Sequence, residues 1–136
     1  MFDWKEFDKW QAALCGWREA RGEGRDGIRA VIHVIANRAK LSGRSWAQEV
    51  YRRLQFSSMT YGQDPQLSIC PHTPDAIFST CYEIADAVMA GTDPDLTQGA
   101  TFYYATSISA PAWVNDPGME YVGTVGSQKF YRGSYS

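Results

Sequence analysis

Residues 17–24, Trp-Arg-Glu-Ala-Arg-Gly-Glu-Gly, lie where one amphipathic helix ends and the next begins. Apolar side chains recur every three to four residues on both sides of this stretch: Trp4, Phe7, Leu14 and Trp17 before it, and Ile28, Val31, Ile32, Ile35 and Ala39 after it. This spacing predicts helices over residues 3–20 and 26–41, separated by Gly22 and Gly24. The second stripe is the more continuous one, so we expect its helix to form the centre of the core.

Two further helices are expected in the middle of the chain. Ser45 and Gln48 form a capping-box pattern, which predicts a short helix that continues through Leu54. Residues 55–72 have no periodicity and predict a long loop, of the kind that often carries function. Thr73-Pro74-Asp75 predicts an N-cap with proline at the first helical position, for a helix that Gly91 ends.

Strands are expected only toward the C-terminus. Residues 100–105 are rich in aromatic residues and threonine, and residues 119–125 and 128–132 predict two more strands. A loop over residues 111–118 separates the first strand from the others. Helices followed by a small sheet indicate an α+β fold, and the length indicates one domain over residues 1–136.

The composition is that of a globular protein, with 44% hydrophobic and 21% charged residues. A net charge of −2 argues against nucleic acid as the main partner, because such binding depends on clustered Lys and Arg. Residues 1–6 lack the features of a secretory signal peptide, and no apolar run is long enough for membrane insertion. We expect a monomer that is synthesised in a bacterial cytoplasm.

The cysteines and histidines do not predict a metal site or a cofactor. Cys15 and Cys81 fall on the apolar sides of expected helices, where a free thiol behaves as a small hydrophobic group. Cys70 and His72, taken with Cys81, fit no zinc-binding spacing. Cys15 is also a poor candidate for a nucleophile, because the C-terminal end of a helix dipole opposes a thiolate.

Glu19 and Glu23 are spaced four residues apart, and this spacing allows two interpretations. One is a solvated, salt-bridged helix end. The other is acid–base chemistry, since the negative end of the helix dipole would raise the pKa of Glu19, as a general acid requires. Arg18, Arg21 and Arg25 would act in the opposite direction if they pointed inward, and the sequence leaves the balance open.

Several motifs follow this stretch in the order typical of one family. They are Gln55-Phe56-Ser57, Ala87-Val88-Met89-Ala90-Gly91 with Asp93-Pro94, Gly99-Ala100-Thr101-Phe102-Tyr103-Tyr104, Pro111 with Trp113, and Val125-Gly126 before Phe130-Tyr131. Together with Glu19-Ala20-Arg21-Gly22-Glu23, they make the chain resemble the SleB-like cell wall hydrolases over residues 10–132. The resemblance implies a lysozyme-like helical core with a small antiparallel β-sheet. It also implies cleavage of the β-1,4 bond between N-acetylmuramic acid and N-acetylglucosamine in peptidoglycan glycan strands.

The resemblance implies that Glu19 is the catalytic residue of a lytic transglycosylase. Its carboxyl group would give a proton to the leaving oxygen and then accept one from the 6-hydroxyl of muramic acid, which yields a 1,6-anhydro sugar. Glu23 is expected to be a helper with a mainly structural role. Further substrate contacts are expected from Gln55, Ser57, Ser58, Thr101, Tyr103 and Tyr104, with Trp113 as a stacking surface. Strand alternation predicts that at most one of the two tyrosines lines the cleft.

Two alternatives stay open on the sequence. One is a hydrolytic muramidase in which Glu23 or Asp64 positions water, and the other is a non-catalytic glycan-binding module or a structural virion protein. The family often has Asn-His where this chain has Ser127-Gln128-Lys129, so no histidine contribution is expected there. A catalytic domain without a signal peptide or a wall-binding module resembles a phage endolysin. It would reach the wall through a holin pore or as a component of the virion.

Overall fold

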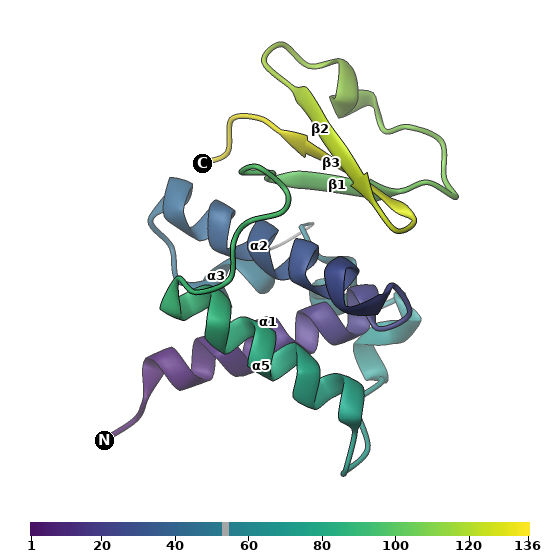
Figure 1. The fold of residues 1–136 in the computed structure, drawn as a ribbon. Coiled ribbons are helices and arrows are strands. Elements are labelled where there is room, and N and C mark those ends of the chain that lie inside the picture. The colour runs from purple at the N-terminus through teal and green to yellow at the C-terminus, as the bar shows by residue number, and fades with distance from the viewer. Residues whose placement is uncertain (53–54) are drawn as a thin grey trace.

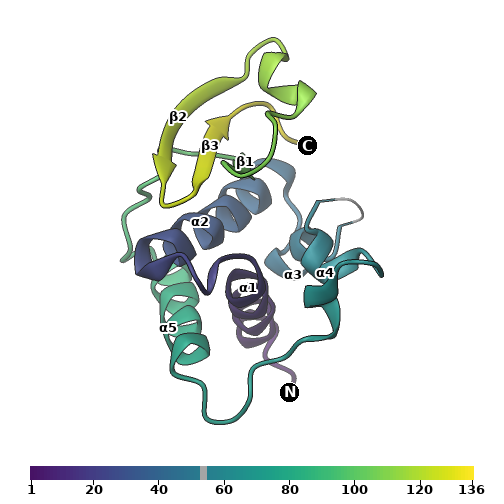
Figure 2. The same ribbon diagram turned by 90° about the vertical axis from the view of Figure 1, so that its right-hand side faces the viewer.

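The computed structural model describes residues 1–52 and 55–136, and it places a group of packed helices beneath a small sheet (Figures 1 and 2). The helices are α1 (Trp4–Ala20), α2 (Gly24–Ser42), α3 (Trp46–Val50), α4 (Ser57–Thr60) and α5 (Ala76–Ala90). The strands are β1 (Phe102–Ala105), β2 (Glu120–Val125) and β3 (Gln128–Arg132). Two short 3₁₀ helices, η1 (Pro65–Ser68) and η2 (Ala112–Asn115), lie in the connections. The predicted α+β class, with the sheet toward the C-terminus, is confirmed.

Helix α2 is the centre of the molecule, as its apolar stripe predicts. Figures 1 and 2 show it between the sheet and the other long helices, α1 and α5. Ile28 and Ile35 belong to a buried cluster shared with α1 and α5. Ala30 and Val34, on another side of α2, pack in a second cluster with Phe130 of the sheet. One helix therefore joins the helical layer to the sheet.

The chain reverses between α1 and α2 within three residues. The backbone N–H of Arg21 donates to the Trp17 carbonyl oxygen and completes the last turn of α1. Gly24 then begins α2 with a φ of 79°, a left-handed conformation that glycine adopts without a steric cost. The predicted helix ends are thus confirmed to within two residues, and the turn leaves Glu19 in the last turn of α1.

The middle of the chain departs from the prediction at two places. The capping box of Ser45 and Gln48 is present and begins α3, but the helix ends at Val50 with Tyr51 as its C-cap, so the expected continuation toward Leu54 is wrong for residues 51–52, and residues 53–54 lie outside the described residues. The expected loop over residues 55–72 contains α4 and η1, because elements of four residues are too short to produce a periodic pattern.

The start of α5 is a second correction. Asp75, and not Thr73, is its N-cap, since the Asp75 Oδ1 accepts a hydrogen bond from the Phe78 N–H at 2.8 Å. Pro74 therefore precedes the helix. Both Thr73 and Asp75 are suitable N-cap residues, and aspartate is at least as favourable as threonine at this position. The helix begins after Asp75. The predicted end at Gly91, in the left-handed conformation, is confirmed.

The described sheet is antiparallel with the strand order β1-β3-β2, so β1 is an edge strand. In its register Tyr103 lies opposite Phe130, and Ala105 lies opposite Gln128. Gln128 and Phe130 are buried on the side of β3 that faces α2, whereas Tyr131 is only partly buried. None of the helices in the described residues combines the length and the apolar character that a membrane span requires.

Candidate active site

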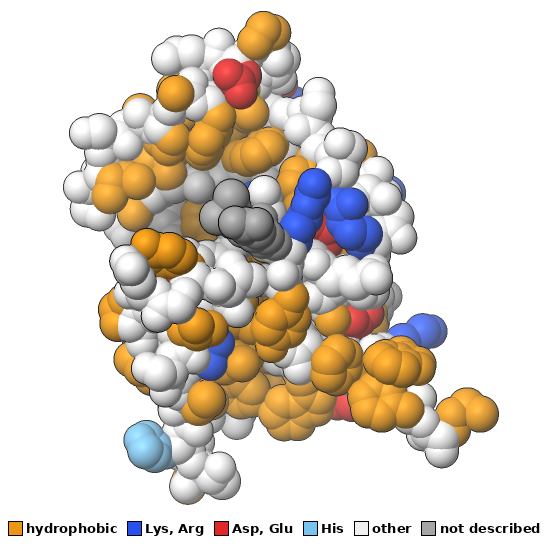
Figure 3. Space-filling view, turned by 180° about the vertical axis from the view of Figure 1, so that it is seen from behind, with side chains coloured by type: hydrophobic (Ala, Val, Ile, Leu, Met, Phe, Trp, Pro, Cys, Tyr) orange, Lys and Arg blue, Asp and Glu red, His pale blue; other side chains and the backbone are white. Residues whose placement is uncertain are grey.

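A pocket of about 540 Å³ lies between the end of α1, the α4–η1 segment and the edge strand β1. Figure 3 looks onto this side of the molecule, where the surface is hollowed between the sheet and the helices below it. The pocket brings together five residues that the sequence predicts for the site: Glu19, Gln55, Ser57, Tyr103 and Tyr104. Two other hollows of similar volume lie beside Trp10 and beside Lys40, and Glu19 lines neither of them.

Glu19 and Tyr103 make the central contact of this pocket. The Tyr103 hydroxyl donates a hydrogen bond of 2.5 Å to Oε1 of Glu19. The Tyr103 ring is held by Phe130 on the adjacent strand, with ring centroids 5.4 Å apart and planes inclined by 27°. Burial, together with the nearby Glu19 charge, raises the pKa of Tyr103 well above its ordinary value. The phenol therefore stays protonated and remains a donor to Glu19.

Both tyrosines of β1 line the pocket, so the expectation that only one would do so is wrong. Tyr103 faces the helices, whereas the Tyr104 ring packs against Tyr131 at a centroid distance of 6.0 Å. Alternation does place them on opposite faces of the strand. Because β1 is at the edge of the sheet, the pocket extends around it and contacts side chains of both faces.

Arg18 fixes the wall of the pocket opposite the sheet. Its Nε donates to the Ile69 carbonyl oxygen at 3.0 Å, and its Nη1 donates to the Ser58 carbonyl oxygen at 3.1 Å. Next to it, the Ser57 hydroxyl donates to Asp64 at 2.6 Å. Asp64 also caps η1, where it accepts from the Gln66 N–H at 2.9 Å. These contacts attach the α4–η1 segment to the end of α1.

Arg38 lies at the base of the pocket and is 4% exposed. Its Nε donates to the Thr101 carbonyl oxygen at 2.7 Å, which attaches α2 to the start of β1. The guanidinium lies over the rings of Phe56 and Tyr135, at 4.9 and 5.0 Å from their centroids. Burial lowers the pKa of Arg38, but an arginine keeps its charge at neutral pH even so.

Glu23 does not line the pocket. Its carboxylate accepts hydrogen bonds from the Ser127 N–H and hydroxyl, each at 2.8 Å from Oε1. This contact joins the α1–α2 turn to the β2–β3 turn. Gly126 allows the close approach, because a Cβ at that position would lie 2.7 Å from the Glu23 Oε1. The geometry therefore fits the expected structural role of Glu23.

Three other expected contact residues also lie outside the pocket lining. Ser58 is on the buried side of α4 and is 1% exposed, and Thr101 is fully buried with its hydroxyl donating to the Gly133 carbonyl oxygen. Trp113 packs edge-on against Tyr104 and Tyr131. These motif residues therefore help to hold the structure around the pocket, and their side chains do not line it.

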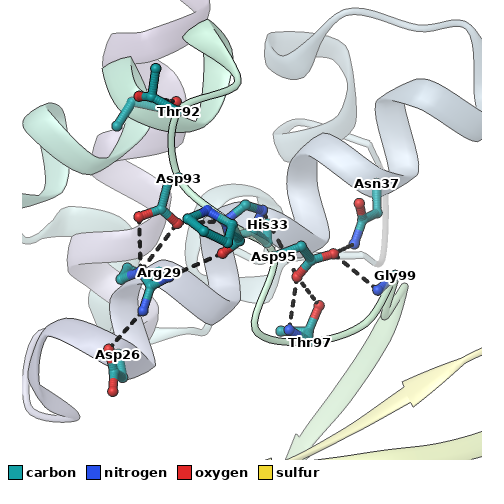
Figure 4. Close-up of polar contacts among 11 residues, drawn as sticks. Asp26, Arg29, His33, Asn37, Thr92, Asp93, Asp95, Thr97 and Gly99 are labelled. Atoms are coloured by element: carbon teal, nitrogen blue, oxygen red, sulfur yellow. Dashed lines mark hydrogen bonds and ion pairs between the residues drawn. The ribbon is translucent and has the colours of Figure 1, made fainter.

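The connection from α5 to β1 is held on α2 by two aspartates (Figure 4). Asp93 accepts from the Arg29 Nε at 3.0 Å and lies 2.7 Å from the His33 Nε2. Burial alone would raise the pKa of Asp93, but the hydrogen bonds from His33 and Arg29 outweigh it and lower that pKa. The sequence identified Asp93 only as part of the Asp93-Pro94 motif.

Asp95 is the second of these aspartates (Figure 4). It accepts from the Asn37 side chain at 2.9 Å, from the Thr97 N–H at 2.8 Å and from the Gly99 N–H at 2.9 Å. Burial raises its pKa, and the hydrogen bonds from Thr97 and Asn37 lower it by more, so the net direction is down. The two aspartates thereby fix the chain just before β1, and so the position of Tyr103.

The two buried thiols, Cys15 and Cys81, do not line the pocket. Cys15 and Cys81 are both fully buried, as their positions in the helical pattern predict. Burial, aided by the Glu19 charge, raises the pKa of Cys15 well above its ordinary value, so this thiol stays protonated. Within residues 1–52 and 55–136, no cluster of three or more His, Cys, Asp or Glu side chains has the geometry to hold a metal ion.

Comparison with known proteins identifies the family. The family model described as Cell Wall Hydrolase matches residues 22–131. The chain belongs to this cell wall hydrolase family. The match includes Glu23, Tyr103 and Gln128, and it begins just after Glu19. No curated protein sequence matches the chain.

Two solved structures share the fold of this cell wall hydrolase family member. The catalytic domain of Bacillus cereus SleB has a TM-score of 0.69 and 20% identity, over 96% of this chain and 91% of that one. The catalytic domain of the germination-specific lytic transglycosylase SleB from Bacillus anthracis has a TM-score of 0.70 and 20% identity, over 95% of both chains. At this level of identity the two matches establish the fold.

The pocket of this family member also contains Arg38 and Gln128, which the sequence analysis did not assign to the site. Arg38 could have been noticed as a charged residue among the buried positions of α2. The signal for Gln128 is a polar side chain at the start of β3 on the face that carries Phe130. Both signals are ambiguous without the sheet, because only the register shows which strand face meets the helices.

Proposed function

We propose that this protein degrades peptidoglycan by cleaving the β-1,4 bond between N-acetylmuramic acid and N-acetylglucosamine, as a lytic transglycosylase with Glu19 as acid and base. Membership in the cell wall hydrolase family supports the substrate class. The name of the Bacillus anthracis neighbour, a lytic transglycosylase, supports the reaction type. The observation that carries the proposal is the partly buried Glu19, held by Tyr103 at a pocket between helices and sheet.

The first step uses the protonated form of Glu19. Its carboxyl group gives its proton to the glycosidic oxygen as the bond from that oxygen to C1 of muramic acid breaks. Tyr103 engages Oε1, and no described residue donates a hydrogen bond to Oε2. Oε2 is therefore the oxygen that would carry the transferable proton.

The second step returns the proton to Glu19. The 6-hydroxyl of the same muramic acid attacks C1, and the Glu19 carboxylate accepts the hydroxyl proton as the new bond forms. The product is a 1,6-anhydro sugar, the leaving strand keeps the first proton, and no water is consumed. One carboxyl group suffices for both steps, which agrees with the assignment of Glu23 to Ser127.

The presence of Asp64 in the pocket supports a second candidate function, that of a hydrolytic muramidase. Asp64 is another carboxylate of the same pocket, and a hydrolase needs a base that positions water. Against this role, Asp64 already accepts from the Ser57 hydroxyl and caps η1. The transglycosylase therefore remains the better supported mechanism.

Wall lysis by three matched variants tests the proposal. Glu19→Gln should abolish the clearing of a suspension of purified sacculi, whereas Glu23→Gln and Asp64→Asn should keep most of it. Circular dichroism would verify that each variant is folded. Full lysis by Glu19→Gln would remove the proposed mechanism, and loss of lysis in Asp64→Asn as well as in Glu19→Gln would favour the hydrolase.

A further inference from the structure

Gln128 occupies a distinctive place beside the Glu19–Tyr103 pair. It is the first residue of β3, lies opposite Ala105 of β1, and is 7% exposed on the strand face that carries Phe130. Because Ala105 is two residues from Tyr103 on β1, their side chains share a face of the sheet. Gln128 thus lines the same pocket as Glu19, next to Tyr103.

The amide group of Gln128 has unused hydrogen-bonding capacity. Its Oε1 is buried and has no partner among the described residues. Arg38, at the base of the same pocket, also has a buried Nη1 without a partner in this part of the chain, so neither atom satisfies the other. Buried polar atoms in native proteins are nearly always hydrogen-bonded to protein or to ordered water, so these two atoms at one pocket are open to water or to a ligand that enters it.

The backbone of Gln128 is fixed although its amide is not. The preceding residue, Ser127, is held by the Glu23 carboxylate through both its N–H and its hydroxyl. The last torsion of a glutamine side chain is soft, and no hydrogen bond from the described residues to Oε1 fixes it. The amide can therefore turn its oxygen or its nitrogen toward a group that enters the pocket.

We propose that Gln128, together with Arg38, forms a subsite for the acetamido group of an amino sugar. Oε1 of Gln128 requires a donor, and Nη1 of Arg38 requires an acceptor. An acetamido group supplies one of each, its N–H and its carbonyl oxygen, whereas an anion supplies only acceptors and a cation only donors. The inference rests on the proposed function, because it assumes that the pocket receives a glycan.

A structural role and a binding role for Gln128 predict opposite effects of Gln128→Leu on stability. If the side chain served the fold, Gln128→Leu would lower stability. In the proposed subsite the same change removes a buried, unpaired oxygen, so stability should stay equal or rise while recognition is lost. Urea unfolding of the wild-type protein and Gln128→Leu separates the two roles.

Binding of neutral oligosaccharides to the full chain tests the subsite without relying on catalysis. In a Glu19→Gln background, calorimetry would compare the β-1,4 tetramer of N-acetylglucosamine with the β-1,4 tetramer of glucose, which has hydroxyls in place of acetamido groups. We expect the acetylated tetramer to bind at least about tenfold more tightly. Adding Gln128→Leu should reduce this preference to about twofold or less, and the matched change Gln11→Leu on α1, outside the pocket, should leave it intact.

The outcomes distinguish this inference from the proposed function. No preference for the acetylated tetramer, no measurable binding of it, or an undiminished preference in Gln128→Leu would each overturn the subsite. Full wall lysis by Glu19→Gln would instead overturn the catalytic assignment, and it would leave the binding comparison valid. Lysis that depends on Glu19 but is unaffected by Gln128→Leu would retain the proposed function and reject the subsite.

Discussion

The Tyr103 hydroxyl and the Glu19 carboxylate form a hydrogen bond of 2.5 Å between residues 84 positions apart in the sequence. The bond joins the last turn of α1 to the edge strand of the sheet, and both residues line one pocket. A hydrogen bond to a charged group is stronger than one between neutral groups, so this contact should position the carboxylate as well as attach the strand.

Tyr103→Phe should therefore reduce catalysis more than stability. The phenyl ring retains its packing on Phe130, whereas the carboxylate loses its donor. We expect kcat on peptidoglycan to fall by about ten- to a hundredfold with a change in KM of less than about threefold. Tyr121→Phe is a matched control, because that hydroxyl is paired with Thr124 on the exposed side of β2. An active Tyr103→Phe enzyme would show that Glu19 needs no such donor.

Glu23 should prove to be a structural residue. Glu23→Ala removes the acceptor for two donors of Ser127 and should lower the free energy of unfolding by about 1–2 kcal/mol, a value reduced for the exposure of this pair. Ser127→Ala removes only the hydroxyl and should cost less. Chemical denaturation measures both. If Glu23→Gln abolished wall lysis at unchanged stability, Glu23 would have to act in the reaction itself.

Stability should fall in acid because of the α5–β1 connection. The pKa of Asp93 in the folded protein is lowered, so the folded state binds its proton less tightly than the unfolded state. The resulting stabilisation is fully present above the unfolded pKa of about 4, begins to be lost as the pH falls through that value, and is gone below the folded pKa. Asp95 acts in the same direction.

Asp93→Asn tests this pH dependence. The variant should be less stable than the wild-type protein by about 1–3 kcal/mol at neutral pH, and the difference should shrink toward pH 3. Urea unfolding at a series of pH values measures it. Asp26→Asn is the matched control, since Asp26 also pairs with Arg29 but is largely exposed. A constant difference at all pH values would exclude Asp93 as the source.

Arg18 should control substrate affinity through the α4 wall. Arg18→Met removes the donors to the Ser58 and Ile69 carbonyl oxygens, which loosens the segment that carries Ser57. We expect KM for glycan strands to rise by about three- to tenfold, less than the loss of both hydrogen bonds would give, because the loosened segment acts on the substrate indirectly. Arg21→Met serves as the comparison, because that guanidinium lies over the Trp17 ring and outside the pocket. Equal effects of the two changes would contradict this role.

The sequence predicted the helical layer well because long periodic elements carry their own signal. The stripe that includes Ile28 and Ile35 defines a helix whose ends are within two residues of those observed. The strand over residues 128–132 was predicted at its observed bounds. In contrast, α4 and η1 are single turns held by Arg18 and Asp64, and such contacts have no local signature.

The candidate site was predicted only in part, because a motif identifies residues but not the direction of their side chains. Glu19 and Gln55 belong to motifs, and the structure brings them to one pocket. Ser58 and Thr101 belong to motifs too, but their side chains are buried, and a motif does not show which way a side chain points. Gln128 could be placed only once the register of β3 with β1 was known.

The products formed from purified sacculi in water enriched in oxygen-18 test the central claim most directly. Mass spectrometry would identify the new glycan ends made by the wild-type enzyme, with Glu19→Gln as the inactive control. The mechanism predicts 1,6-anhydro-muramic acid ends without oxygen-18, and no new ends with Glu19→Gln. Reducing ends that carry oxygen-18, or the same products from Glu19→Gln, would contradict it.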